Sequence, residues 1–323
     1  MKILSIIPGS GQGSSMIFAS RLISALIELG MSNTTYGLDT GAARYWSGLT
    51  KLRRLLKELQ PDIVTAHYGS LTGLTASLLG GSRAVVIFRG SDLNPWKGPR
   101  LHVWMSHVLS HMAAYKAKHV VCVSKELRRK LWWRRAGIDI LPTGVDENLF
   151  RPTEFALARR LLGWSCSERV VLFNGSNRLV KRLDRAMKSV SVAEILLGMP
   201  IRLEVLEGET PPDRIPLMMS AANCLLMASD YEGSPTVVQE AMACQLPVVS
   251  VDVGDVREML AGVTPSWIVR SDPDDIGRAL AECLCHDGSR RSNGREVIQR
   301  CSLSGIAERF EAIYSAVAGE VRL

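Results

Sequence analysis

The chain has 323 residues and a net charge of +7, and 46% of its residues are hydrophobic while 22% are charged. This composition supports a buried core and excludes an intrinsically disordered chain, and the length is typical of two domains of ~100–200 residues each. The apolar runs are far shorter than the ~18 residues of a membrane span, and the apolar start is too short for a signal peptide. The seven cysteines are scattered and form no C-x-x-C pair, which favours free thiols in a reducing cytoplasm.

The charge is divided unevenly along the chain. Residues 1–163 contain 22 Lys and Arg against 10 Asp and Glu, a net charge of +12, whereas residues 164–323 contain 17 against 22, a net charge of −5. This asymmetry favours two separate modules. A basic first module attracts anionic partners, which include anionic lipid, nucleic acid and phosphorylated substrates.

Short β-rich runs alternate with helical patterns throughout the sequence. In the first half we predict strands at 2–7, 62–67, 84–88, 119–124 and 138–142. The helical patterns between them cover 15–29, 47–59, 70–79, 100–114 and 125–135. The second half repeats this scheme, with strands at 169–175, 201–208, 223–229, 247–252 and 266–269. Near-continuous apolar strands separated by helices indicate parallel sheets covered on both faces, so the sequence predicts two doubly wound α/β domains.

A polar, proline-containing stretch at 142–154 is the predicted connection, and we place the domain boundary near Gly163. The expected domains are 1–163 and 164–302, and residues 303–323 form a terminal helix that is a candidate for packing back on the first domain. Open α/β sheets bind ligands at the carboxyl ends of their strands, so a cleft between the two domains is the expected site.

Two glutamates, Glu232 and Glu240, stand close to a predicted helix start, with seven residues between them. Ser234 suits the N-cap of this helix and Pro235 suits its first turn, so free backbone N–H groups and the positive helix dipole would face a ligand. Such a helix end suits phosphate, while carboxylates accept hydrogen bonds from hydroxyl groups. A nucleotide sugar has this layout of ribose diol, diphosphate and sugar. The alternative is one capping acid and one solvated acid.

Two cations, Arg178 and Lys181, follow the first strand of the second half within 173–187. There they would neutralise a diphosphate bound near the same edge of the sheet. A solvated start of the following helix is the alternative.

The segment Glu232-x7-Glu240 followed by "EAMACQLPVVSVDVG" resembles the most specific motif of the retaining glycosyltransferases of family 4, which have the GT-B fold of two Rossmann-like domains. The resemblance covers nearly the whole chain, because five further segments match in order: "PGSGQGSSMIFASRLISALIELG", "PDIVTAHYGSLTG", "VVIFRGSDL", "VVCVSKELRRKL…ILPTGVDENLFRP" and "NGSNRLVKRLD".

The resemblance implies a role for each matching donor-site residue. Glu232 would contact the donor sugar and Glu240 the ribose hydroxyls. Arg178 and Lys181 would bind the diphosphate. The backbone of the helix start would also hold the diphosphate, at Gly233, Ser234, Pro235 and Thr236, and the first glycine loop would border it through Gly11 and Gly13.

The sequence departs from the family pattern on the acceptor side. Arg89 replaces the family's histidine before G-x-D, so it is a candidate for binding an acidic acceptor or a phosphate, while Asp92 keeps its place. His67, at the end of a predicted strand, is a weaker acceptor-site candidate. We expect the acceptor near these residues, Gly69 and the segment 96–104. In the donor half, Gly175-Ser176 replaces Gly-Arg, which makes the assignment of Arg178 less secure than that of Lys181, and Val253-Gly254 replaces Gly-Gly.

The expected activity is that of a metal-independent retaining hexosyltransferase acting in surface polysaccharide or glycolipid assembly. Its substrate would be a UDP- or GDP-linked sugar, with a glycan or glycolipid as acceptor, and no cofactor or metal is expected. The two cations and the helix end would stabilise the leaving diphosphate. In retaining members the leaving phosphate is thought to act as the base, so no protein nucleophile is expected.

Other interpretations remain open. A catalytically silent nucleotide-sugar-binding subunit is one, and a nucleotide-sugar epimerase on the same fold is another. NAD binding by "GSGQGSS" is disfavoured, because the spacing is G-x-G-x-G and no acid ends a clear second strand. Nucleic-acid binding is disfavoured because the sequence contains no recognised nucleic-acid-binding module.

Two surface features allow more than one reading. The basic stretch 124–137 with Trp132 and Trp133 predicts either a contact with the anionic inner surface of a membrane, through 125–135, or a solvated face. If the first interpretation holds, the protein is cytoplasmic and binds peripherally to the inner face of that membrane. Three histidines, His102, His107 and His111, are expected to be packed or solvated rather than to bind a metal.

Overall fold

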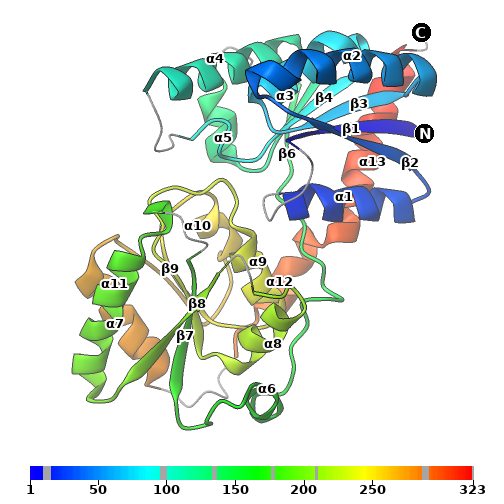
Figure 1. Cartoon of the computed structure of the whole chain (residues 1–323). Coiled ribbons are helices and arrows are strands. Elements are labelled where there is room, and N and C mark those ends of the chain that lie inside the picture. Colours follow the sequence, from blue (N-terminus) through cyan, green and yellow to red (C-terminus); the bar gives the residue numbers. More distant parts are fainter. Residues whose placement is uncertain are drawn as a thin grey trace. The chain divides into compact units, whose positions relative to one another are not determined.

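A computed structural model describes residues 1–9, 16–94, 100–132, 137–175, 179–207, 210–285 and 291–321. The chain forms two compact units (Figure 1). Unit 1 comprises Met1–Gly144 and Leu303–Leu323, and unit 2 comprises Val145–Ser302. All seven cysteines have free thiols, as the sequence predicts.

Unit 1 contains a six-stranded parallel sheet in the order β2-β1-β3-β4-β5-β6. The strands are β1 (Lys2–Pro8), β2 (Ser32–Leu38), β3 (Ile63–His67), β4 (Ala84–Phe88), β5 (His119–Cys122) and β6 (Ile138–Ile140). The helices are α1 (Ile17–Glu28), α2 (Ala42–Leu59), α3 (Ser70–Gly80), α4 (Arg100–Lys116), α5 (Lys125–Lys130) and α13 (Leu303–Val321), and a 3-10 turn, η2 (Gly81–Arg83), precedes β4.

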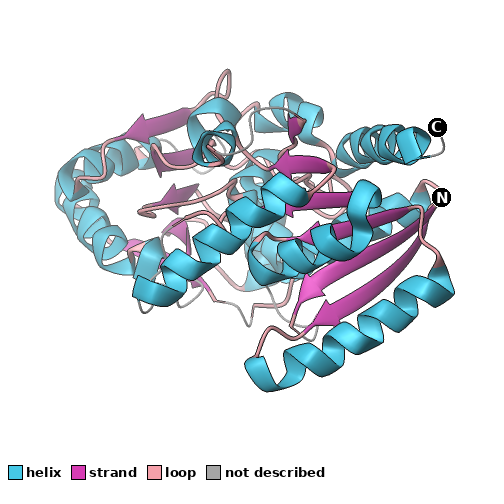
Figure 2. Ribbon diagram, turned by 90° about the horizontal axis from the view of Figure 1, so that it is seen from above, coloured by secondary structure: helices cyan, strands magenta, loops and turns pink. Residues whose placement is uncertain are grey.

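Alternate side chains of the central strands fill two separate cores, one on each face of this sheet. Val64 and Val86 pack with residues of α2, α3 and α4, whereas Ile63 and Val85 pack with residues of α1 and α13. Helices therefore cover both faces (Figures 1 and 2). Successive side chains of a strand point to opposite faces, so a strand buried on both faces must be apolar throughout, which is the pattern of the sequence.

The edge strand β2 is absent from the sequence prediction. Its sequence, SNTTYGL, is mostly polar, and its side chains are mostly half-buried or exposed. Asp39 follows β2 directly, so the argument that no acid ends a second strand was wrong. This carboxylate is used locally: Oδ1 accepts a hydrogen bond from the Gly41 N–H at 2.9 Å, and Oδ2 pairs with Arg44 at 3.2 Å.

Unit 2 contains a five-stranded parallel sheet in the order β11-β10-β9-β7-β8. The strands are β7 (Arg169–Asn174), β8 (Ile201–Leu206), β9 (Cys224–Met227), β10 (Val248–Val251) and β11 (Ser266–Val269). The helices are α6 (Phe155–Leu162), α7 (Leu183–Leu197), α8 (Arg214–Ala221), α9 (Thr236–Ala243), α10 (Val256–Met259), α11 (Pro273–Leu284) and α12 (Gly294–Ile298), with 3-10 turns η3 (Leu179–Lys181) and η4 (Gln299–Cys301). One continuous core joins the strands to the helices.

The division between the units lies after Gly144 and not near Gly163, as the sequence suggested. The reason is Arg159 of α6, which is fully buried in unit 2. Its Nε donates to the Ala221 carbonyl at 2.8 Å and its Nη2 donates to Asn223 Oδ1 at 2.8 Å. These bonds attach α6 to α8 and to the start of β9, so the whole segment from Val145 belongs to unit 2.

Several helices differ in length from their predicted ranges, and α2, predicted at 47–59, begins at Ala42. The helix predicted at 125–135 is described as α5 only to Lys130, and residues 133–136 lie outside the described part of the chain. The terminal helix predicted at 303–323 is described from Leu303 to Val321 and belongs to unit 1. Among the described residues, no helix combines the length and apolarity that crossing a bilayer requires.

Candidate active site

Lys181 and Glu232 form an ion pair at the carboxyl edge of the sheet of unit 2. Lys181 ends η3, which follows β7, and Glu232 lies in the loop that follows β9. Because β7 and β9 are parallel neighbours, these two loops emerge side by side. Lys181 Nζ donates to Glu232 Oε1 at 2.7 Å, and the side chains are only 10% and 14% exposed. The structure thus brings together two of the predicted donor-site residues.

Asp230 ties the same two loops together. Its backbone N–H donates to the Val180 carbonyl at 2.9 Å, and its Oδ1 accepts from Arg185 Nη2 at 2.9 Å and from Arg182 Nη1 at 3.1 Å. Arg185 Nη1 also donates to the Ala228 carbonyl at 2.6 Å. These bonds hold η3 against the 228–232 loop, so the position of the Lys181 ammonium depends on Asp230.

The sequence analysis missed Asp230 and Arg185. The signal was present, because Asp230 comes two residues before Glu232 and Arg185 lies one helical turn beyond Lys181.

Helix α9 begins at Thr236, and its N-cap is Pro235 rather than Ser234 as predicted. Pro235 has extended backbone angles (φ −73°, ψ 105°), and within the described part of the chain no side-chain cap hydrogen bond is made to this helix start. Ser234 Oγ instead accepts a long hydrogen bond, 3.5 Å, from Gln239 Nε2. A helix that begins four residues after Glu232, without a capping side chain among the described residues, leaves backbone N–H groups suited to an anion.

Glu240 is buried within α9, four residues after its first residue. Cys244 follows one turn later, and burial, together with the negative charge of Glu240, raises the pKa of its thiol to about 12. The thiol is therefore neutral near pH 7 and is not an activated nucleophile.

Gly254 follows β10 and packs against the backbone of the Glu232 loop. Its φ is +61°, and a Cβ at this position would lie 3.0 Å from the Gly233 carbonyl oxygen and 3.3 Å from Glu232 Cβ. Only glycine fits both the backbone angle and the space. The glycine retained in the Val253-Gly254 pair therefore supports the loop that carries Glu232.

Three donor-site candidates, Arg178, Gly11 and Gly13, lie outside the described residues. The structural assignment of the donor side thus rests on Lys181, Glu232, Glu240 and the start of α9.

In unit 1, the Asp92 carboxylate organises the loops that follow β3 and β4. It is buried and accepts the backbone N–H of Gly69 at 3.0 Å, of Arg89 at 3.2 Å and of Gly90 at 2.8 Å. Burial raises its pKa, and these three N–H donors partly oppose that rise. Asp92 was predicted as an acceptor-binding residue, and here its carboxylate binds the backbone.

The loop that starts at Tyr68 is tightly constrained. Tyr68 (φ 82°) and Ser70 (φ 56°) have positive φ values on either side of Gly69. A Cβ on Gly69 would lie 2.4 Å from Phe88 Cε1, so no larger residue fits without a shift. Such strain is common where a loop serves a functional site.

His67 and Arg89 form a buried pair at the ends of β3 and β4. Arg89 Nη2 donates to His67 Nδ1 at 3.1 Å, so the imidazole carries its proton on Nε2. Burial lowers the pKa of His67 well below its usual value, and the charge of Arg89 lowers it further. Within the described residues, Arg89 Nε is buried without a hydrogen-bond partner.

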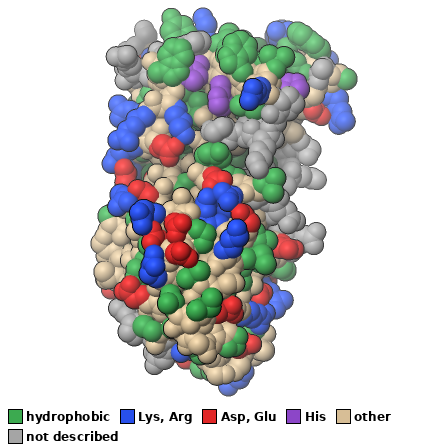
Figure 3. Space-filling view, turned by 90° about the vertical axis from the view of Figure 1, so that its left-hand side faces the viewer, with side chains coloured by type: hydrophobic (Ala, Val, Ile, Leu, Met, Phe, Trp, Pro, Cys, Tyr) green, Lys and Arg blue, Asp and Glu red, His purple; other side chains and the backbone are tan. Residues whose placement is uncertain are grey.

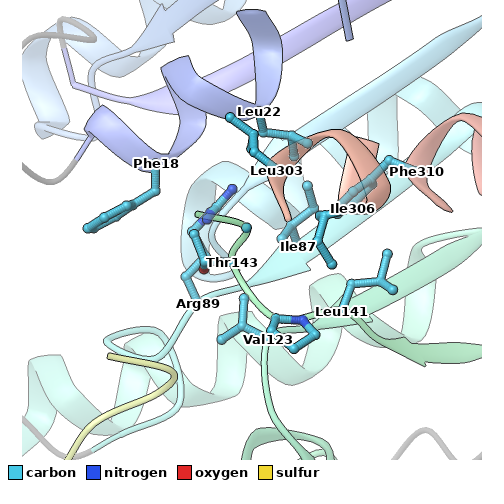
Figure 4. A pocket seen from close by; sticks show the side chains of 12 residues that line it. Phe18, Leu22, Ile87, Arg89, Val123, Leu141, Thr143, Leu303, Ile306 and Phe310 are labelled. Carbon is cyan, nitrogen blue, oxygen red and sulfur yellow. The ribbon is translucent and has the colours of Figure 1, made fainter. Parts of the chain in front are cut away.

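Arg89 also lines a small pocket within unit 1 (Figure 4). Figure 4 shows the arginine beside Thr143, with apolar side chains of α1, β4 and α13 around it. The other lining residues are Phe18, Leu22, Ile87, Val123, Leu141, Pro142, Gly144, Leu303, Ile306 and Phe310. A guanidinium with an unused N–H donor, surrounded by apolar side chains, can bind a single anionic group.

Segments of both units match models of known protein families. The model of the family described as "Glycosyl transferases group 1" matches residues 197–299, and that of "Glycosyltransferase Family 4" matches residues 29–149. The first range contains Glu232, Asp230 and Gly254, and the second contains His67, Arg89 and Asp92. The chain belongs to the family 4 glycosyltransferases.

Individual relatives with glycosyltransferase names agree with this placement. The chain is 36% identical over 286 residues to a 2-deoxystreptamine N-acetyl-D-glucosaminyltransferase of Streptomyces fradiae, covering 73% of this chain and 66% of that protein. It is 27% identical over 229 residues to TuaC of Bacillus subtilis, whose name assigns it provisionally to teichuronic acid biosynthesis, covering 63% and 56%. The chain spans about half the length of the first curated relatives that it matches.

A solved structure supports the GT-B fold. Anabaena Alr3699/HepE in complex with UDP-glucose has a TM-score of 0.71 and 16% sequence identity, covering 98% of this chain and all of that one. At this identity the likeness establishes the fold, two Rossmann-like domains, and the fold agrees with the prediction.

Proposed function

We propose that this family 4 glycosyltransferase is a retaining, metal-independent hexosyltransferase that moves a sugar from a nucleotide sugar to a glycan or glycolipid acceptor in surface polysaccharide biosynthesis. The observation that carries the proposal is the Lys181–Glu232 pair at the N-terminus of α9, with Glu240 buried farther along the same helix. A cation, an uncapped helix end and two carboxylates within one loop-and-helix unit match the phosphates and hydroxyls of a nucleotide sugar.

Each side chain then has a role in the donor complex. Lys181 and the N–H groups at the start of α9 bind the diphosphate, joined by Arg178. Glu240 binds the ribose hydroxyls, and Glu232 binds a sugar hydroxyl while it keeps the Lys181 ammonium in place.

The reaction begins with cleavage of the bond between the anomeric carbon and the diphosphate oxygen. Negative charge develops on that leaving oxygen, where Lys181 and the helix end stabilise it electrostatically. The leaving oxygen takes the proton of the acceptor hydroxyl on the same face of the sugar, and the acceptor oxygen bonds to the anomeric carbon on that face. The configuration is therefore retained without a protein nucleophile, and the neutral Cys244 thiol agrees with this scheme.

We assign the acceptor to unit 1, near Arg89. The buried guanidinium has an unused Nε donor and lines the pocket of Figure 4. A carboxylate or phosphate on the acceptor would complete its hydrogen bonding. His67 fixes the orientation of the guanidinium.

A thermal-shift screen tests the donor site. UDP-, GDP-, dTDP- and ADP-linked sugars are each added to the whole chain, and UDP-glucose and UDP-N-acetylglucosamine are included because of the names of the relatives. A ligand at 100 times its dissociation constant stabilises the folded state by ~2.7 kcal/mol. We expect one nucleotide class to raise the melting temperature, and the absence of any shift would remove the donor-site proposal.

A non-catalytic nucleotide-sugar-binding subunit is the rival from another class, and an epimerase is the rival enzyme. Mass spectrometry of the reaction products distinguishes the three. A transferase forms a glycosylated acceptor and free nucleoside diphosphate, an epimerase returns an isomeric nucleotide sugar, and a binding subunit returns its ligand unchanged. We place the protein in the cytoplasm and, with a lipid-linked acceptor, at the inner surface of the membrane.

A further inference from the structure

Helix α4 packs in the reverse of the usual sense: it buries small side chains and exposes large ones. Ser110, Ala113 and Ala114 are buried against α3, whereas Leu101, Trp104 and Tyr115 are 65%, 62% and 66% exposed. A helix on a water-exposed surface ordinarily directs its large apolar residues inward.

Hydrogen bonds to α3 fix this orientation. Ser110 Oγ accepts the Ser70 backbone N–H at 2.9 Å, and Ser77 Oγ donates to the Ala113 carbonyl at 3.0 Å. Helices α3 and α4 also approach each other closely at Gly73, because a Cβ on Gly73 would lie 3.3 Å from Ala113 Cβ. Helix α4 therefore cannot turn its large residues inward without breaking the α3 interface.

The exposed residues form one stripe along the helix. Leu101, Trp104, Met105, Met112 and Tyr115 follow each other at the three- and four-residue spacing of one helix face, and the half-buried Val108 fills the gap. Trp132, which is 63% exposed, extends the stripe sideways. Its ring lies 5.1 Å from that of His111, measured between ring centroids. We call these exposed residues of α4, with Trp132, the α4 face.

Cations lie at both ends of the α4 face and on the neighbouring helix α5. Arg100 and Lys116 lie at the two ends of α4, which contains no acidic residue, and Arg128 and Arg129 are exposed on α5 beside it. The acid of α5, Glu126, is paired with Lys130. Figure 3 shows hydrophobic side chains, histidines and basic residues together on this part of unit 1. Unit 1 as a whole has 21 Lys and Arg against 10 Asp and Glu, a net charge of +11.

Exposed apolar residues alone do not identify a partner, as unit 2 shows. Helix α7 also exposes large apolar residues, among them Met187, Ile195 and Leu196. However, α7 packs on α11, whose first turn contains Asp274 and Asp275, and unit 2 has 18 Lys and Arg against 22 Asp and Glu, a net charge of −4. Of these two surfaces, the α4 face and α7, the α4 face is the one that combines exposed apolar side chains with a net positive unit.

We propose that the α4 face binds the surface of a bilayer that contains anionic lipids. Tryptophan and tyrosine side chains are favoured at the boundary between headgroups and acyl chains, and nearby Lys and Arg side chains are attracted electrostatically to an anionic surface. The sequence offered 125–135 as one candidate for such a contact, whereas the exposed apolar side chains lie mainly on α4, with exposed basic residues on α5. This inference does not depend on the proposed enzymatic function, since it uses no donor-site residue.

Vesicle co-sedimentation of the whole chain tests the proposal. The probes are vesicles of phosphatidylcholine alone and vesicles with 30% phosphatidylglycerol, at low salt and at 0.5 M NaCl. We expect binding to the anionic vesicles only, and a loss of at least tenfold in the apparent partition coefficient at high salt.

The double substitution Met112→Gln/Tyr115→Gln and the charge substitution Arg128→Gln/Arg129→Gln should each weaken binding about tenfold or more. The matched control Ile195→Gln/Leu196→Gln on α7 should bind like the unsubstituted chain.

Three outcomes would overturn the proposal: no binding to anionic vesicles, equal binding to neutral ones, or full binding by the α4 variants. Sedimentation velocity of the lipid-free protein adds a fourth, since a dimer abolished by Met112→Gln/Tyr115→Gln would assign the face to a second copy. Circular dichroism checks that each variant is folded. The nucleotide-sugar thermal shift of the variants reports on unit 2, so failure of this inference and failure of the proposed function are distinguished.

Discussion

Lys181 Nζ and Glu232 Oε1 meet at 2.7 Å although 51 residues separate them in the sequence. Both side chains are largely buried, and a buried ion pair is sensitive to the loss of either member. The proposed donor phosphate therefore meets an ammonium group whose charge Glu232 already neutralises in part.

We predict that Glu232→Gln separates binding from turnover. Removing the carboxylate charge leaves the Lys181 ammonium unneutralised, so the affinity for a nucleoside diphosphate should rise about tenfold, a change of ~1.4 kcal/mol. Turnover should fall about 10²–10³-fold, because the sugar loses its carboxylate partner and Lys181 loses its support. Calorimetric titration and product formation measure the two effects. The control is Glu204→Gln, since Glu204 pairs with Arg202 at the surface, and unchanged turnover in Glu232→Gln would contradict the assignment.

Asp230 should act as a positioning residue. Asp230→Asn removes its charge from Arg182 and Arg185, and we expect a loss of ~1–3 kcal/mol in the free energy of unfolding together with an about tenfold lower kcat. Asp230→Glu should restore part of the kcat, because the carboxylate remains. A purely structural role would lower the melting temperature of Asp230→Asn and leave the kcat of the folded fraction unchanged.

Gly254→Ala should weaken donor binding. An added Cβ would lie 3.0 Å from the Gly233 carbonyl oxygen, so the loop that carries Glu232 must shift. We expect an about tenfold weaker donor affinity and a loss of ~1 kcal/mol or more in stability. Gly262→Ala is the matched control, because Gly262 also has a positive φ, +85°, but a Cβ there meets no atom within 4 Å. Equal donor affinity in the two variants would exclude this role for Gly254.

His67 should make the protein less stable in mild acid. Burial and Arg89 hold its folded-state pKa well below its usual value, so below pH ~6.5 the unfolded chain binds more protons than the folded one. The contribution of His67 to stability is fully present above that pH and is lost progressively as the pH falls below it. Urea unfolding between pH 7.5 and 5 measures it. His67→Gln should flatten the decline, whereas His102→Gln, at an exposed position, should not.

Metal removal should leave the transfer rate unchanged. If Lys181, Arg178 and the start of α9 stabilise the leaving diphosphate, no divalent cation is needed for that step. The measurement compares initial rates in EDTA and in excess Mg²⁺ or Mn²⁺. A rate lost in EDTA and restored by one of these ions would assign the leaving-group charge to a metal.

Much of the fold could be predicted because its signals are local. The apolar runs that become β3, β4 and β7 are buried on both faces, and such runs are recognisable without knowledge of their partners. The edge strand β2 was missed because a half-exposed strand needs no apolar run. The domain boundary was misplaced because Arg159, a charged residue, is buried through hydrogen bonds to Ala221 and Asn223, which no local pattern reveals.

By itself, the sequence determined the alternation of strands and helices, the family and the segment that contains Glu232 and Glu240, since these depend on residue order and periodicity. Only the tertiary structure decided that Lys181 meets Glu232, that the Asp92 carboxylate accepts backbone N–H groups and that α4 turns its large residues outward. These relationships depend on which strands are neighbours and how closely two helices approach. Both are set by packing across distant parts of the chain.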